Sequence, residues 1–107
     1  MINVKGLESK LERECRDYVE HAHKGKLIKA KIIGQNGWPD RMLLLPQCPV
    51  IFVEFKAQGE KPRTNQKRWR QWLRDNGFLH WVIDDWGSFL TLVEITTSAR
   101  RSHVDSQ

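Results

Sequence analysis

The sequence predicts a single α/β domain with a mixed β-sheet flanked by helices, in the order α-β-β-β-α-β-α. Helical periodicity covers residues 7–22, and β-type segments follow at residues 27–33, 40–45 and 50–57. A second helical segment at residues 64–76 precedes a strand at residues 79–84. Because this helix lies between the third and fourth strands, we expect a right-handed crossover there.

The first helix is predicted from apolar residues that recur at spacings of three and four: Leu7, Leu11, Cys15, Tyr18 and Ala22. The next segment alternates, with Ile28, Ala30 and Ile32 on one face and Lys29 and Lys31 on the other. We therefore expect a strand with one buried apolar face and one wet, basic face.

The second and third strands are predicted on either side of a proline turn at residues 46–49. The segment at residues 50–57 is apolar on both faces up to Glu54, which is typical of a central strand. A strand at residues 40–45 would pair with it as a hairpin.

The remaining elements are predicted from their end signals. The second helix is expected to be capped by Thr64 or Asn65, to run to Asn76 and to stop at Gly77. A last helix is expected to begin at Ser88, although three threonines within residues 91–97 would also suit a strand.

Composition restricts the class of protein. The net charge of +5 and a pI near 9.5 favour a polyanionic partner. No apolar run approaches the roughly 20 residues of a membrane helix, and the N-terminus lacks a signal-peptide stretch, so we expect a soluble, cytoplasmic protein. Cys15 and Cys48 belong to no CxxC pattern, so we expect two reduced thiols and no structural zinc. The domain is expected over residues 1–98, followed by a frayed polar tail at residues 99–107.

Asp40, Glu54 and Lys56 are the candidate catalytic residues. Asp40 opens the second strand after Gly-Trp-Pro, and Glu54 and Lys56 are two apart on the third, so they share a face. Carboxylates can hold Mg²⁺, which neutralises phosphate charge and activates water, while a lysine positions the nucleophile. The hairpin would bring the three side chains together.

The alternative is that Glu54 and Lys56 form a structural ion pair, since Glu-x-Lys alone is common. Against this, Glu54 directly follows a strongly apolar run, where a charge is costly without a purpose. Asp40 also stands on the neighbouring strand.

Three elements together resemble the VRR-NUC (virus-type replication-repair nuclease) family of the PD-(D/E)XK nuclease superfamily: Gly37-Trp38-Pro39-Asp40, Val53-Glu54-Phe55-Lys56 and Gln66 in the next helix. The resemblance covers about residues 7–84. It implies a restriction-endonuclease-like core and a nuclease dependent on Mg²⁺ or Mn²⁺. Small stand-alone members look like phage-type proteins that act on branched DNA, as Holliday junction resolvases do.

The family also carries a glutamate on its first helix, and Glu8, Glu12 and Glu14 compete for that role. At about 100° per residue, Glu8 lies roughly 45° from the centre of the apolar stripe, Glu14 roughly 75° and Glu12 roughly 85°. Glu8 therefore borders the core, and its spacing to Leu11 agrees with the family pattern. Glu12 is the alternative.

Gln66 shares a helix side with Trp69 and Leu73, so we expect a buried amide that supports the metal site. The alternative is an amide bonded to nearby backbone. The opposite side of that helix is basic. We expect phosphate contacts from this basic side of the helix, from the arginine just before it and from the first strand: Lys67, Arg70, Arg74, Arg63, Lys29 and Lys31.

The sequence thus predicts an endodeoxyribonuclease that cuts branched DNA. Glu8, Asp40, Glu54 and the Phe55 carbonyl would hold Mg²⁺ or Mn²⁺, and Lys56 would position the water. Symmetric cutting of a junction needs two sites, so a homodimer is expected. A nickase, a flap or single-strand nuclease, and a DNA-binding module without catalysis are the alternatives.

Overall fold

The computed structural model confirms the predicted order of elements. It describes the backbone of residues 4–30, 37–57, 59–61 and 63–105, and the side chains of residues 10–30, 37–57, 59–61 and 63–100. The helices and strands are α1 (Val4–Ala22), β1 (Lys26–Lys29), β2 (Arg41–Leu44), β3 (Ile51–Phe55), α2 (Thr64–Asp75), β4 (Leu79–Ile83) and α3 (Trp86–Asp105).

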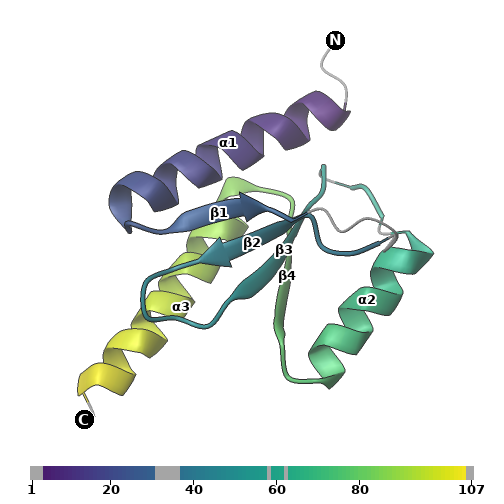
Figure 1. Cartoon of the computed structure of the whole chain (residues 1–107). Helices are drawn as coiled ribbons and strands as arrows, with labels where there is room; N and C mark the ends of the chain where they lie inside the picture. Colours follow the sequence, from purple (N-terminus) through teal and green to yellow (C-terminus); the bar gives the residue numbers. More distant parts are fainter. Residues whose placement is uncertain (1–3, 31–36, 58, 62, 106–107) are drawn as a thin grey trace.

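The four strands form one mixed sheet in the order β1-β2-β3-β4 (Figure 1). The β1–β2 and β2–β3 pairs are antiparallel, and the β3–β4 pair is parallel. β3 is therefore central, as predicted, and α2 is the connection that brings β4 back beside it in the same direction.

One face of the sheet forms the main core with α1 and α3. On β3 the odd-numbered residues Ile51, Val53 and Phe55 point to this face and are buried. The helices contribute apolar side chains that are equally inaccessible: Cys15, Val19, Phe89, Leu92 and Val93. Burying this much apolar surface is the main stabilising contribution to the domain.

The other face of the sheet lies under α2 and carries an aromatic cluster. Trp38, Phe52, Trp69, Trp72 and Phe78 meet mostly edge to face, with ring centroids 4.7–6.3 Å apart. Phe52 belongs to β3, whose even-numbered residues point this way. Glu54 and Lys56 therefore share this face with Phe52.

The predicted orientation of the first strand is wrong. Leu27 is the buried residue of β1, at 8% exposure, and Ile28 is 41% exposed. Leu27 lies opposite Leu43, a core residue, so the β1–β2 register decides which face points inward. The expectation for Lys31 and Ile32 falls outside the described residues.

The ends of two helices also differ from expectation. The N-cap of α2 is Arg63. The Asp85 carboxylate accepts the Ser88 backbone N–H at 2.6 Å, so Asp85 fills the capping role expected of Ser88. α3 begins at Trp86 and continues to Asp105, so residues 99–105 are helical where a frayed tail was expected.

The threonines of α3 are accommodated by the helix itself. The hydroxyl groups of Thr91, Thr96 and Thr97 each donate to the carbonyl four residues earlier. Of the helices in the described part of the chain, none is both long and apolar enough to cross a membrane.

Candidate active site

Asp40 is positioned by the turn that precedes β2. Gly37 has φ +86°, and a Cβ there would lie 2.4 Å from a backbone atom of Asn65, so only glycine fits against the start of α2. Trp38 packs edge to face on Trp69 and Phe52. Pro39 is fully buried. Packing on both sides of this turn holds Asp40 just before the start of β2.

The β2–β3 hairpin then places Asp40 and Glu54 on neighbouring strands. Arg41 lies opposite Val53, so the preceding residue, Asp40, comes level with Glu54. The Phe55 backbone N–H donates to the Asp40 carboxylate, which ties the two strands together at this point. The Phe55 side chain points into the main core and is 1% exposed, as expected.

Two buried carboxylate oxygens at this place have no hydrogen-bond partner: Asp40 Oδ1 and Glu54 Oε2. Glu54 is only 2% exposed. A buried, unpaired carboxylate oxygen is costly, and a bound cation would remove that cost. Within the residues whose side chains are described, no three His, Cys, Asp or Glu groups gather closely enough to form a ready metal cage. Two carboxylates still fit Mg²⁺, which keeps several waters.

Glu12 and Arg41 surround Asp40. Arg41 donates to the Asp40 carbonyl at 2.9 Å and forms an ion pair with Glu12. Burial, and secondarily the charge of Glu12, raises the pKa of Asp40 to about 6, against the opposing effects of Arg41 and backbone hydrogen bonds. Glu12 thus reaches the site even though its helix angle placed it away from the core. The Glu8 side chain lies outside the described residues.

Lys56 is buried to 8% exposure beside the acids. Its Nζ lies 4.0 Å from Glu60 Oε1, a long contact to a half-exposed partner. Across the described side chains, no ion pair joins Lys56 to Glu54, so the alternative of a simple same-face pair is not what the structure contains. Lys56 remains close to the site with only a weak partner.

The partner of Glu54 is His80, which sequence reasoning missed. His80 Nε2 lies 3.1 Å from Glu54 Oε1, and the histidine side chain is fully buried. His80 lies on β4 opposite Phe52, on the same face as Glu54. Only the parallel β3–β4 register reveals this proximity, and nothing in the spacing of the four histidines indicated it.

Gln66 is buried at 8% exposure, as predicted. Its Oε1 accepts the Arg63 backbone N–H at 2.9 Å, which is the alternative local role considered for this amide. The hydrogen bond fixes the start of α2 and holds Gln66 against the sheet.

The predicted basic residues lie on two surfaces. Arg63, Lys67 and Arg74 are exposed along α2, but Arg70 is half-buried, with a buried Nε that has no partner. Arg70 lies four residues after Gln66 and so shares its side of the helix.

Lys29 lines a hollow of about 270 Å³ between α1 and the sheet, with Arg13, Arg16 and Arg41 nearby and Glu12 at its edge. This basic groove adjoins Asp40 through Arg41.

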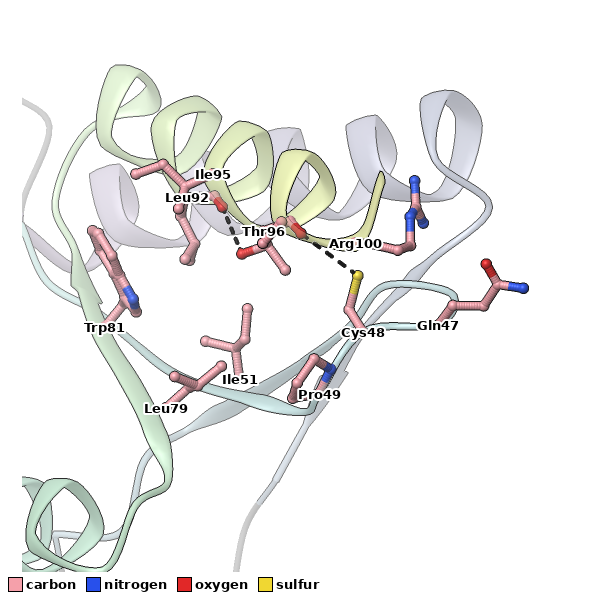
Figure 2. Close-up of a pocket in the computed structure, with 11 residues that line it drawn as sticks. Gln47, Cys48, Pro49, Ile51, Leu79, Trp81, Leu92, Ile95, Thr96 and Arg100 are labelled. Carbon is pink, nitrogen blue, oxygen red and sulfur yellow. Dashed lines mark hydrogen bonds between the residues drawn. The ribbon is translucent and has the colours of Figure 1, made fainter. Parts of the chain in front are cut away.

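A larger, mostly apolar hollow lies elsewhere. Figure 2 shows it between α3 and the sheet, with Trp81, Leu92 and Ile51 pointing inward and Cys48 at one end. Its volume is about 730 Å³. None of the candidate catalytic residues lines it, so we assign it no part in the chemistry.

Comparison with known proteins supports the predicted resemblance. No family model matches the sequence. A solved structure described as a "VRR_NUC domain" is similar at a TM-score of 0.74 and 27% identity, over 82% of this chain and 95% of that one. "Putative nuclease p44" of Acyrthosiphon pisum secondary endosymbiont phage 1 is 54% identical over 35 residues, which are 33% of this chain and 38% of the phage protein.

The chain therefore has an α/β fold that is similar to that of a solved VRR-NUC domain. Part of its sequence is also similar to a putative phage nuclease. The sequence match spans only 38% of the phage relative, so activity, substrate and partners are argued separately below.

Proposed function

We propose that the domain is a metal-dependent endodeoxyribonuclease that hydrolyses phosphodiester bonds in branched DNA. The observation that carries the proposal is the pair of buried carboxylate oxygens, Asp40 Oδ1 and Glu54 Oε2, which lack partners beside a buried lysine. A structural role leaves this arrangement unexplained, because unpaired buried charge destabilises a protein.

Each residue of the site has a distinct task in the proposal. Asp40 and Glu54 bind Mg²⁺ or Mn²⁺, with Glu8 and the Phe55 carbonyl as the expected further ligands. The bound cation supplies charge neutralisation for the phosphate and lowers the pKa of water. Lys56 orients the attacking water and offsets phosphate charge. Gln66 supports the site from α2, and Glu12 is the alternative acid from α1.

DNA would approach this site over two basic surfaces, the groove beside α1 and the exposed side of α2. The basic groove presents Arg13, Arg16 and Lys29 beside Arg41, which contacts Asp40 directly. A second set of cations lies on α2 and comprises Arg63, Lys67, Arg74 and the half-buried Arg70. Lys31 is expected to add to the cations of the basic groove. These residues neutralise backbone phosphates without reading bases, so recognition would depend on DNA shape.

Branched DNA and a homodimer complete the proposal. One chain supplies one site, whereas symmetric cutting of a four-way junction needs two. Leu79 and Ile95 are 42% and 55% exposed beside the apolar hollow of Figure 2, and pairing of two copies would cover such side chains. We expect the protein to act in the cytoplasm, that of the host where a phage encodes it.

The deciding experiment compares cleavage of junction, flap, linear and single-stranded DNA with Mg²⁺, Mn²⁺ or EDTA. The proposal expects junction cleavage that requires a divalent cation. Preference for flaps, nicks or single strands would favour the other nuclease alternatives. Analytical ultracentrifugation showing a monomer even with junction DNA bound would refute the homodimer.

A matched variant separates catalysis from binding. Lys56→Ala should abolish cleavage and leave DNA affinity nearly unchanged, because Lys56 lies inside the site and away from the basic groove. Lys67→Ala on the exposed side of α2 is the control, and it should weaken binding slightly and reduce the salt dependence. Unchanged cleavage by Lys56→Ala would contradict the assignment and favour another role for the fold.

A further inference from the structure

The buried contact between His80 and Glu54 joins the last strand to the proposed metal site. His80 Nε2 lies 3.1 Å from Glu54 Oε1, and the two side chains are 0% and 2% exposed. A carboxylate only accepts hydrogen bonds, so Nε2 must carry the proton and donate it. The other ring nitrogen, Nδ1, is buried and has no partner.

The unpartnered Nδ1 indicates which form of the ring is present. A proton on Nδ1 would place an unpaired N–H in a buried position, which is costly. The neutral ring with its proton on Nε2 avoids that cost and keeps the bond to Glu54. The geometry therefore favours the tautomer of His80 that carries its proton on Nε2.

The bond also fixes the carboxylate of Glu54. With Oε1 bound to β4, rotation of the carboxylate is restricted and Oε2 is left as the open oxygen. We propose that His80 is a positioning residue, which holds Glu54 so that Oε2 faces the divalent cation. This inference rests on the proposed function, because it needs Glu54 to be a metal ligand.

A purely structural role explains the arrangement less well. Replacing a buried polar pair by apolar side chains is often neutral or stabilising, so β4 gains little from a histidine at this position. Partners that orient a metal ligand usually matter for affinity, and their loss typically weakens metal binding about 10- to 100-fold.

The test measures Mn²⁺ affinity of the DNA-free protein by electron paramagnetic resonance. His80→Leu removes the donor while filling similar space, and it should weaken Mn²⁺ binding about 10- to 100-fold. His80→Gln keeps an amide donor and should recover part of the affinity. Leu73→Ala, at another buried position of the α2 layer, is the control: it should lower stability and leave Mn²⁺ affinity unchanged.

The outcomes distinguish this inference from the proposed function. If His80→Leu binds Mn²⁺ like the wild type while Glu54→Gln does not, the positioning role is refuted and the metal site stands. If the wild type and Glu54→Gln bind Mn²⁺ equally weakly, the proposed metal site fails, and the inference fails with it.

A measurement on the wild type covers the case in which His80→Leu does not fold. Long-range ¹H–¹⁵N NMR of the metal-free protein should show the His80 proton on Nε2 and a bare Nδ1. A proton on Nδ1 with a bare Nε2 would overturn the inference, because that tautomer cannot donate to Glu54.

Discussion

Replacing Asp40 by asparagine should make the metal-free protein more stable at neutral pH while removing a proposed metal ligand. Burial raises the pKa of Asp40 from an ordinary 3.8 to about 6, so the charged carboxylate present at neutral pH destabilises the folded state. Asparagine is neutral and nearly the same shape, and its oxygen can still accept the Phe55 N–H. The variant therefore removes the cost of the charge and keeps the contact.

The magnitude follows from linkage. Each pKa unit corresponds to about 1.4 kcal/mol. A rise of about two units in the pKa of Asp40 therefore lowers the free energy of unfolding by at most about 3 kcal/mol. Asp40 is partly exposed, and solvent screening reduces this to about 1–2 kcal/mol. Between about pH 4 and pH 6 the native state keeps a proton that the unfolded chain has released, so the free energy of unfolding falls as pH rises through this window.

Urea denaturation in EDTA would measure the effect. Asp40→Asn should exceed the wild type by about 1–2 kcal/mol at pH 8, by roughly half of that at pH 5, and by little at pH 4. Asp84→Asn, at an exposed acid, should show no comparable gain. Mg²⁺ should then stabilise the wild type and leave Asp40→Asn unchanged. A variant less stable than the wild type at pH 8, or a gain independent of pH, would refute the reasoning.

Three further outcomes follow from the packing and charges. Glu12→Gln should lower the carboxyl pKa of Asp40 below about 6, as followed by NMR titration, because the Glu12 charge raises it; an unchanged midpoint would contradict their proximity. Cys48 should react with a thiol reagent in the folded protein, whereas Cys15, buried and with its pKa raised to about 12, should react only on unfolding; equal rates would contradict this. Phe89→Ala should cost about 3–5 kcal/mol in urea, and a cost below about 1 would place Phe89 outside the core.

Local sequence patterns were sufficient for the order of the elements and for the β2–β3 hairpin. A short proline turn joins these neighbouring strands, so the spacing alone places Asp40 level with Glu54 in the sheet. The face of β1 was not recoverable in the same way. Alternation leaves two choices, and the pairing of Leu27 with Leu43 selects between them.

The contacts that were missed depend on packing between distant elements. Helix periodicity gives only the direction in which a side chain points around its own helix. It could not show that Arg41, at the start of β2, forms an ion pair with Glu12 on α1. His80 meets Glu54 only because the parallel β3–β4 register sets Phe52 opposite His80. The spacing of residues along the chain predicts neither the strand register nor the position of the helices on the sheet.

The parallel pairing of β3 with β4 also has a consequence for the order of folding. The β2–β3 hairpin can form from neighbouring residues, whereas β4 can pair only after α2 has crossed the sheet, because nonlocal parallel pairing carries a larger loop-closure cost. We therefore expect the strands that carry Asp40 and Glu54 to pair early during folding, and the strand that carries His80 to join late. We expect a nascent chain that ends before residue 79 to hold both acids without the strand that fixes Glu54.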